Sequence, residues 1–515
     1  MDKLGRRTNR KHTIIPDYRR SPKAFMRKNN FIKKITDEII KSKSINNALQ
    51  KSQRLGNLLW DNNIGIYDRN ELENSLSERY TKEMSDKEAK ELAITTIEGE
   101  LFIVSQPYFT GGHTRLMERL SSFLEKKPDL LITRNVNDDM IIRMNGFFND
   151  VFLYSEKKFP DDKKRIFELA KKIITYKNVI LNIHPDDIHA VIACSLVKKI
   201  DSTIKFFFVN HADHTFSYGS SIADIWFEIS EFGRRVDSLR NLTAKKSFLG
   251  IPIESVSSYS GQYNVSRNIK DGDIFFTSAA SYKYNKVKEE SFKPLIHKII
   301  KNYPKSKFYI IGCDITKDLW WIIEKIKHRG NIKLIENVSY DNYLKITKGA
   351  SVYIDSHPLP GGTAFSEQYF SHKICAGVVS PIQGYSPIEL FKEKNIDNIF
   401  SIKKTKEEIQ EIDSMAQEIH SIASVKKRFN DAIYNNTYAE NLCTKYIPWS
   451  GDIHFLEEKR IKTIPKSFKK FDRMKIICLT NLGVVNFINN LIKIKTKKLL
   501  ATVLKKYFIH DHLKN

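Results

Sequence analysis

Two runs of alternating strand-like and helix-like segments constrain the fold of this chain more than any other feature. Short apolar segments rich in Ile, Val and Phe, typical of buried strands, alternate with amphipathic segments typical of helices. The strand-like segments of the first run lie at 101–106, 130–134, 179–184, 205–210, 224–230 and 247–253. Those of the second run lie at 273–279, 307–313, 332–336, 351–356 and 374–381. The helices are expected at 115–126, 161–175 and 187–198, then at 288–302, 317–328, 340–348 and 405–437. The alternation predicts parallel βαβ units, and therefore an α/β protein with two Rossmann-like, doubly wound domains.

Changes in composition set the expected domain boundaries. The 515 residues suffice for several domains, and a hydrophobic content of 41% indicates a folded chain. We expect a basic arm and helical region at 1–95, a first Rossmann-like domain at 96–265, a second at 266–440 and a basic helical extension at 441–515. Within the first of these regions, residues 1–40 are basic and weakly patterned, which predicts a flexible or peripheral arm.

The formal net charge of +25 favours anionic partners. Nucleotides, phospholipid head groups, acidic polysaccharides and nucleic acids all qualify. No recognised nucleic-acid motif or aromatic stacking platform is present, so nucleic acid is not expected. From residue 464 onward, lysines are interleaved with Leu, Ile and Val. This pattern predicts either a basic amphipathic helix on an anionic membrane or helices packed on the body with a solvated lysine face.

The cysteines and the N-terminal residues bear on the compartment. The five cysteines are scattered without a CxxC pair, which favours a reducing compartment and predicts neither a zinc site nor a disulfide framework. The first twenty residues contain no apolar core of a signal peptide, and no apolar run is long enough to span a bilayer. We therefore expect a cytoplasmic protein, peripheral at the inner face of the plasma membrane if the tail binds lipid.

The segment from Ser351 to Gly377 has the pattern of a phosphate-binding strand, loop and helix. An apolar strand leads into a loop with two prolines and two glycines, and a helix is expected to begin at Thr363. Unpaired N–H groups and the positive end of a helix dipole bind anions, and Gly361 and Gly362 let an anion approach the backbone. Glu367, one turn later, is placed to reach a ribose hydroxyl. The alternative is an ordinary β–α connection.

Polar residues follow several other strands, where ligands bind in such sheets. In the first domain these residues are Gly111, Gly112, His113, His184, His211, Asp213 and His214. A histidine suits proton transfer near neutrality, so His113 or the cluster of His211, Asp213 and His214 is the candidate catalytic base. The glycines and His184 are expected to line the cleft. The alternatives are chain turns and helix caps, and capping is the expected task of Asp186 and Asp187. Two histidines three residues apart are weak support for a metal, so none is predicted.

After the first strand of the second domain, Lys283 is placed to meet a diphosphate as a point charge, with Lys286 as the substitute. The alternative is an ordinary surface lysine.

The arrangement resembles the GT-B fold of glycosyltransferases, in which two Rossmann-like domains face each other across a cleft. The carboxyl-terminal half is similar to the nucleotide-binding half of the O-GlcNAc transferase and HMW1C-like group. The residues that carry the resemblance are Tyr282 and Lys283, and the series Asp355, Pro358, Gly361, Thr363 and Glu367. Two departures are an extra residue between Asp355 and Pro358 and a Glu in place of the ribose-binding Asp.

The resemblance implies a glycosyltransferase that uses a UDP-sugar as co-substrate, without cofactor or metal. The second domain would hold the nucleotide-sugar, with Tyr282, Lys283, Pro358, Gly361, Gly362, Thr363 and Glu367 at the donor. The first domain would hold the acceptor, which is a glycan, a lipid-linked glycan or a protein. Three alternatives stay open: a teichoic-acid-type polyol phosphotransferase, a sugar-nucleotide epimerase, and a non-catalytic basic protein that binds membranes or nucleic acid.

Overall fold

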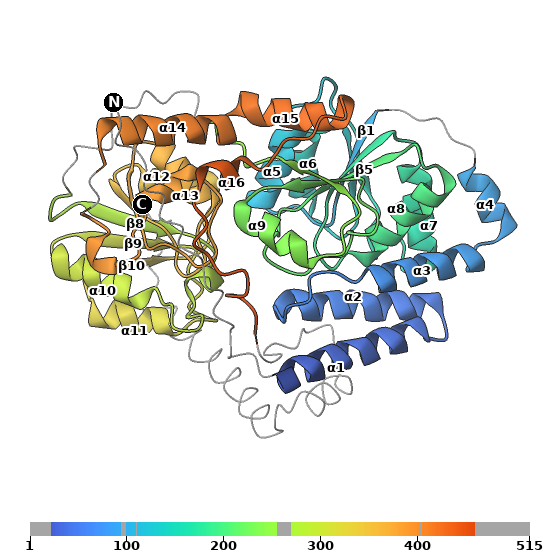
Figure 1. Ribbon diagram of the computed structural model, residues 1–515, viewed down its shortest axis with the longest axis horizontal. Helices are drawn as coiled ribbons and strands as arrows, with labels where there is room; N and C mark the ends of the chain where they lie inside the picture. Colours follow the sequence, from blue (N-terminus) through green and yellow to red (C-terminus); the bar gives the residue numbers. More distant parts are fainter. Residues whose placement is uncertain (1–21, 94–98, 110, 255–268, 402–403, 459–515) are drawn as a thin grey trace, which may run out of the picture.

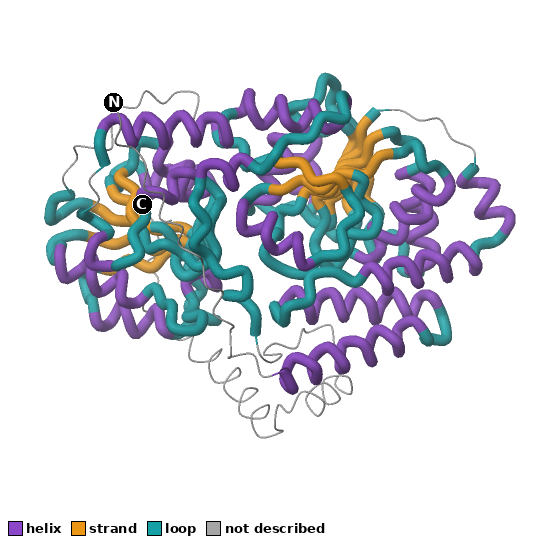
Figure 2. The backbone as a smooth tube through the Cα atoms, viewed as in Figure 1, coloured by secondary structure: helices purple, strands orange, loops and turns teal. Residues whose placement is uncertain are grey.

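The computed structural model describes residues 22–458 except 94–98, 110, 255–268 and 402–403 (Figure 1). It contains two separate groups of parallel strands, each covered by helices on both faces (Figure 2). The N-terminal helices are α1 (Pro22–Ile40), α2 (Ile45–Asp61), α3 (Asn70–Glu83) and α4 (Asp86–Leu92). The first domain continues with β1 (Glu100–Val104), α5 (Gly112–Ser121), β2 (Asp129–Ile132), α6 (Asp138–Asn145), β3 (Val151–Leu153), α7 (Asp162–Ile173), β4 (Asn178–Asn182), α8 (Ile188–Ile200), β5 (Lys205–Val209), β6 (Ile225–Glu228), α9 (Glu231–Val236) and β7 (Lys245–Phe248).

The second domain and the C-terminal helices follow along the chain. They comprise β8 (Ile274–Ser278), the 3-10 helix η3 (Ser281–Tyr284), α10 (Lys293–Asn302), β9 (Lys307–Ile311), α11 (Trp320–Lys327), β10 (Ile332–Ile335), α12 (Tyr340–Thr347), β11 (Val352–Ile354), α13 (Thr363–Phe370), β12 (Ile374–Ala376), α14 (Lys406–His420), α15 (Ile422–Tyr434) and α16 (Leu442–Tyr446).

The first sheet has the strand order β3-β2-β1-β4-β5-β6-β7, and all its pairs are parallel. Successive side chains of a strand point to opposite faces, so a strand covered on both faces is apolar throughout. In β1, Leu101 and Ile103 join the core on one face, while Phe102 and Val104 join the core on the other. The strand order reverses between β1 and β4, and such a switch point leaves a crevice at the carboxyl ends of the strands.

The second sheet repeats this plan with the order β10-β9-β8-β11-β12, again all parallel. Phe275 of β8 faces the core shared with α10 and α11, and Phe276 faces the core shared with α13 and α14. Its switch point lies between β8 and β11. The α/β class and the two Rossmann-like domains expected from the sequence are confirmed.

The N-terminal helices pack on the first domain. Helix α1 buries Phe31, Ile32 and Ile39 in the same core as α2, α7 and α8. Of the two forms expected for the basic arm, flexible or peripheral, α1 matches the peripheral one, because apolar residues about four apart pack this helix against α2. Residues 1–21 lie outside the described part of the chain.

The segment expected to be helical at 405–437 consists of two helices joined at Ser421. This residue ends α14, and its hydroxyl caps α15 by accepting from the Ser424 N–H at 3.3 Å. Helix α14 lies along the second domain, whereas α15 lies along the first (Figure 1). Val425 and Phe429 of α15 belong to the core of the first sheet. The range 266–440 assigned to the second domain thus contains a helix, α15, that packs on the first domain.

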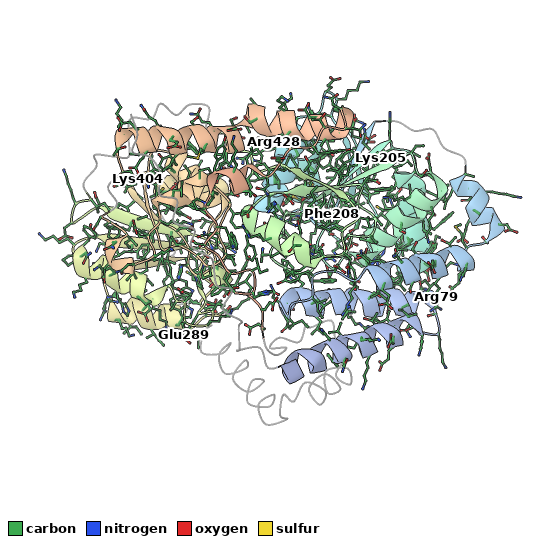
Figure 3. The ribbon with its side chains drawn as sticks, in the orientation of Figure 1. Arg79, Lys205, Phe208, Glu289, Lys404 and Arg428 are labelled. Carbon is green, nitrogen blue, oxygen red and sulfur yellow. The ribbon has the colours of Figure 1, made fainter. Side chains whose placement is uncertain are left out.

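Arg428 of α15 holds this crossing in place (Figure 3). Its guanidinium donates to the carbonyls of Leu249 at 2.9 Å and Ile419 at 2.5 Å. The chain therefore returns to the first domain at a fixed point, which ties the two domains together.

Two elements of the first domain were not expected from the sequence. Helix α6 begins after Asn137, whose side chain accepts from the Met140 N–H at 3.3 Å, and the short strand β3 pairs with the edge of the sheet. The segment expected as a strand over 247–253 ends at Phe248. Among the described residues, no helix combines the length and the apolar character needed to cross a bilayer. The basic segment from residue 464 lies outside the described residues, and its membrane binding stays a prediction.

Candidate functional site

The two switch points face one another across a cavity of about 890 Å³. The first domain contributes the residues that follow β1, β4 and β5, and the second contributes those that follow β8 and β11. Of the residues expected to take part in catalysis, to bind the donor or to line the cleft, all but Pro358 line this cavity, whereas Asp355 and Lys286 do not. The Pro358 carbonyl instead accepts from the Ser380 hydroxyl at 2.5 Å, which places this residue in the support of the loop.

The loop after β11 presents a helix N-terminus to the cavity. Helix α13 begins at Thr363, as expected, and no side chain in the described part of the chain caps it. Gly362 has φ 56°, a conformation that favours glycine, and a Cβ on Gly361 would lie 2.5 Å from Asp355 Oδ1. Gly362 is thus required by its backbone conformation, and Gly361 by the close approach of the Asp355 side chain. Free N–H groups and the helix dipole make this end of α13 a place for an anion.

A buried ion pair holds the loop in shape. Asp355 accepts from the Gly361 N–H at 2.9 Å, and its other oxygen lies 2.6 Å from Lys392 Nζ. Burial lowers the pKa of Lys392, but Asp355 and Glu389 outweigh it and raise that pKa overall. Lys392 therefore stays charged, and both oxygens of the Asp355 carboxylate are used to hold the loop.

Lys283, in η3, brings a cation beside the loop. Its ammonium donates to the Pro360 carbonyl at 2.8 Å, two residues before Gly362, the N-cap of α13. Burial lowers the pKa of Lys283, while Asp355 and Asp213 act in the opposite direction. A diphosphate at the end of α13 would supply the negative charge that this partly buried ammonium needs. Tyr282, the neighbouring residue, is half exposed in the same cavity.

Glu367 lies at the cavity but contacts the opposite domain. Its Oε1 is 3.6 Å from Arg115 and 3.5 Å from Arg119, both on α5. The carboxylate thus bridges α13 and α5 across the cavity. A ribose hydroxyl would have to share this carboxylate with the two arginines, and the ribose contact stays a prediction.

His113 lies in the first turn of α5, which begins three residues earlier than expected from the sequence. Its Nε2 is 3.3 Å from the Gln106 carbonyl oxygen. Because a carbonyl only accepts, Nε2 carries the hydrogen and Nδ1 keeps the basic lone pair. Burial lowers the pKa of His113 below its usual 6.5, so the ring is neutral at pH 7. These properties suit a proton acceptor.

His211 stacks on His113, with ring centroids 5.4 Å apart. Burial, with the nearby positive charges of His113 and His184 when they are protonated, lowers the pKa of His211 to about 3. A general base works best with a pKa near the operating pH. His211 is therefore the weaker candidate of the two, and its ring forms a wall for His113.

Asp213 and His214 complete the cluster after β5. Asp213 is buried and accepts from the Ser230 hydroxyl and, at 3.0 Å, from the Tyr385 hydroxyl of the second domain. His214 Nδ1 lies 3.5 Å from the same carboxylate. Asp213 thus joins the two domains, which leaves it less free to accept a proton from an acceptor.

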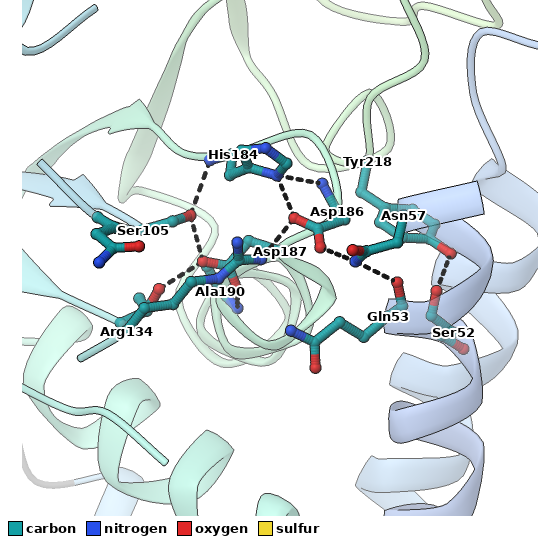
Figure 4. Close-up of polar contacts among 12 residues, drawn as sticks. Ser52, Gln53, Asn57, Ser105, Arg134, His184, Asp186, Asp187, Ala190 and Tyr218 are labelled. Atoms are coloured by element: carbon teal, nitrogen blue, oxygen red, sulfur yellow. Dashed lines mark hydrogen bonds and ion pairs between the residues drawn. The ribbon is translucent and has the colours of Figure 1, made fainter. Parts of the chain in front are cut away.

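His184 forms part of a polar network at the end of β4 (Figure 4). It contacts Asp186, which also pairs with Arg134 at 2.5 Å. Burial raises the pKa of Asp186, but His184 and Arg134 outweigh it and lower that pKa to about 2. Asp187 caps α8 through the Ala190 N–H at 3.2 Å, as expected, whereas Asp186 does not cap but orients His184.

Several residues of the cavity were not expected from the sequence. Trp60, at the end of α2, borders the cavity and lies edge-on to His184, with ring centroids 5.1 Å apart. Tyr385 reaches the cavity from the segment after β12. Neither follows a strand of its sheet directly, so the strand-end rule does not find them.

Potential metal ligands group together away from the cavity. Among the described residues, His297, Glu324 and His328 of α10 and α11 have ligand atoms within 4.8 Å of one another. His297 Nε2 lies 2.7 Å from Glu324, and Lys327 and Lys293 lie 3.5 and 3.9 Å from the same carboxylate. The two ammonium groups already neutralise this carboxylate.

The chain matches no known protein family and none of the curated proteins in sequence. Its structure is similar to that of Anabaena HepE in complex with UDP-glucose, with a TM-score of 0.48, 11% identity, and coverage of 65% of this chain and 99% of HepE. A Thermobaculum terrenum O-GlcNAc transferase gives a TM-score of 0.44 and 11% identity, with coverage of 85% of this chain and 84% of the transferase. A Rickettsia bellii UDP-N-acetylglucosamine 2-epimerase gives a TM-score of 0.34 and 13% identity, with coverage of 65% of this chain and 99% of the epimerase.

The fold class rests on the two sheets themselves. Two parallel, doubly wound domains with their switch points facing across one cavity form the GT-B arrangement.

Proposed function

We propose that the protein is a metal-independent glycosyltransferase that moves a sugar from a nucleotide-sugar, a UDP-sugar in the first instance, to an acceptor hydroxyl or amide. One observation carries the proposal: an uncapped helix N-terminus and Lys283 lie on one side of a cavity, and the neutral His113 lies on the other. The first side suits a diphosphate and the second suits proton removal from an acceptor.

In the proposed reaction the acceptor oxygen attacks the anomeric carbon of the sugar. The bond between that carbon and the diphosphate oxygen breaks, and its electron pair leaves with the diphosphate. Lys283 and the N–H groups at the start of α13 stabilise the charge that develops there. The acceptor proton passes to Nδ1 of His113. Two positive groups on the protein supply the stabilisation that a metal ion supplies in other enzymes.

The other residues of the cavity position these groups. Asp355 holds the glycine loop by accepting from the Gly361 N–H, and the ring of His211 stacks on the ring of His113. Tyr282 borders the donor side, and His184 and His214 border the acceptor side. We place the protein in bacterial surface-glycan or glycoprotein synthesis, in the cytoplasm and peripheral to the plasma membrane. The resemblance to the O-GlcNAc transferase and HMW1C-like group supports a protein acceptor, and the high positive charge supports an acidic glycan or a lipid-linked one.

A thermal-shift comparison with UDP, GDP, CDP, CMP and several UDP-sugars tests the donor. In EDTA, UDP and at least one UDP-sugar are expected to raise the melting temperature, and added magnesium is expected to change this little. Stabilisation by CDP or CMP alone would favour a polyol phosphotransferase. If no nucleotide changed the melting temperature, the result would favour the alternative of a non-catalytic protein that binds membranes or nucleic acid.

Product analysis separates transfer from epimerisation. A glycosyltransferase releases UDP in proportion to glycosylated acceptor, whereas an epimerase converts the UDP-sugar without an acceptor. Conversion of the sugar with no acceptor present would contradict the proposed function.

Replacing His113 by Asn tests the proton acceptor. Loss of a positioned general base lowers kcat by about 10²- to 10⁴-fold, while the UDP affinity stays the same. Because the pKa of His113 is lowered, the parent enzyme keeps its rate at pH 6.5 and loses it only as the pH falls through that lowered pKa. The variant is expected to lose this acid limb.

His372→Asn is the matched control for this experiment. His372 lies outside the cavity with φ 61°, a conformation that Asn tolerates well, and the control should keep the parent rate. An unchanged kcat in His113→Asn would assign the proton acceptor to another residue.

A further inference from the structure

Helix α2 carries a polar stripe beside the face that it buries in the core of the first domain. Gln50, Gln53, Arg54, Asn57 and Trp60 recur every three or four residues and therefore share one face of the helix. The opposite face is buried in the core, with Leu49, Leu55 and Leu59 among its residues. Two residues of the stripe hydrogen-bond the first domain: Gln50 donates to Asp162 at 3.0 Å, and Asn57 donates to Asp186.

The stripe runs beside a second cavity and ends at the first. Its first four residues border a cavity of about 400 Å³ together with Arg134 and Asp186. Arg134 borders both cavities, and Trp60 borders the main one. A ligand that leaves the main cavity past Arg134 therefore meets the polar face of α2.

The walls of this passage are held rigidly. Asn57 donates to Asp186, which also binds His184 and Arg134, so the network links α2 to the ends of β4 and β2 (Figure 4). In contrast, the Gln53 amide has no hydrogen-bond partner among the described residues, and Figure 4 shows it extending from α2 into the space before α8. A preformed wall with an unused amide is suited to a ligand that both donates and accepts hydrogen bonds.

We infer that the acceptor is an oligosaccharide whose terminal sugar lies between Trp60 and His113 and whose preceding sugars run past Arg134 along α2. This inference rests on the proposed function and names the acceptor class for it. Side-chain amides match sugar hydroxyls, because each amide offers both donors and an acceptor. The indole of Trp60 offers an apolar face for a sugar ring. The passage is lined by amides and charged groups, which is unsuited to a lipid chain.

The test measures binding of the full-length, UDP-loaded protein to a printed array of defined linear oligosaccharides of increasing length and of synthetic peptides. The parent is expected to bind oligosaccharides and to bind longer ones more tightly than a single sugar. Gln53→Ala is expected to weaken this binding about threefold to tenfold, since it removes one or two hydrogen bonds. Gln53→Trp, which fills the passage, is expected to weaken it at least tenfold while the UDP affinity stays unchanged.

Asn74→Trp is the matched control, because it places the same bulk at an exposed position of the neighbouring helix α3, outside both cavities. It should bind the array like the parent. Failure to bind UDP would contradict the proposed function itself. Three outcomes with normal UDP binding would overturn the oligosaccharide inference but not the donor site. The parent could bind peptides alone, it could bind no oligosaccharide, or the parent and Gln53→Trp could bind the array equally.

Discussion

Replacing Lys283 by Met will weaken UDP binding by about 10- to 100-fold, the loss expected for a charge-assisted hydrogen bond to a partly buried anion. The loss in kcat/KM should be larger, about 10²- to 10³-fold beyond binding, because the leaving diphosphate gains charge in the transition state. Isothermal titration with UDP and steady-state kinetics with a UDP-sugar measure the two effects separately.

The fold should survive this substitution. Burial lowers the pKa of Lys283, which means that the folded protein disfavours its charged form relative to water. Met has a similar length and no charge, so the melting temperature without ligand is expected to stay the same or rise. A melting temperature that falls together with the affinity would assign Lys283 a structural task instead.

The binding should also depend on pH with a defined sign. An anion raises the lowered pKa of Lys283, so the protein takes up a proton when UDP binds above the pKa of the free form. The UDP affinity therefore falls as the pH rises through that lowered pKa, at a lower pH than an ordinary lysine would give. This alkaline limb should be absent in Lys283→Met.

Lys286→Met is the matched control for Lys283→Met. Its side chain is 62% exposed and lies 3.7 Å from Glu289, three residues along the same segment. It should leave UDP affinity and kinetics unchanged. Equal losses in the two variants would show that general positive charge, and not a specific contact, attracts the nucleotide.

Local pattern sufficed to predict which residues of the second domain lie at this cavity. The glycine loop before Thr363 and the lysine after β8 are visible because each follows an apolar strand within a few residues. The geometry of a strand, a loop and a helix is set by neighbours in the chain, and parallel strands bring their carboxyl ends to one edge. Once the alternation is recognised, these residues must lie near a crevice.

Contacts between distant segments were not predictable in this way. Glu367 was expected at a ribose, but its two arginine partners come from α5 in the other domain. Asp213 follows a strand as a candidate base would, yet Tyr385 and Ser230 occupy its carboxylate. The sequence pattern does not show how the two domains contact each other. It therefore predicts unpaired polar side chains at positions where the folded protein has paired ones.

The N-terminal helices show the same limit on the first-domain side of the cavity. Helix α2 reads as an ordinary amphipathic helix, and only its docking on α7 and α8 turns Trp60 toward the cavity. The switch of α15 to the first domain is likewise invisible locally, because its apolar stripe would fit either sheet. The sequence pattern predicts the helices and strands, whereas tertiary contacts determine which domain each helix packs against.

Replacing Lys392 by Met should destabilise the second domain by about 3–5 kcal/mol, the usual loss when one partner of a buried ion pair is removed. Lys392 and Asp355 are both 2% exposed in their side chains, with 2.6 Å between Nζ and Oδ2. Without the ammonium, the buried carboxylate loses its counter-charge while it still holds Gly361. Denaturant unfolding followed by tryptophan fluorescence measures the loss, since Trp320 and Trp321 lie in this domain.

A second variant separates the ion pair from general damage to the core. Asp355→Asn keeps an oxygen for the Gly361 N–H but removes the charge that Lys392 neutralised. The double variant Lys392→Met with Asp355→Asn should therefore recover a large part of the lost stability, as double-mutant cycles require for a coupled pair. Lys394→Met, at an exposed position two residues on, should change little. Additive losses in the double variant would mean that Asp355 and Lys392 act independently, and that the glycine loop takes its shape from its backbone alone.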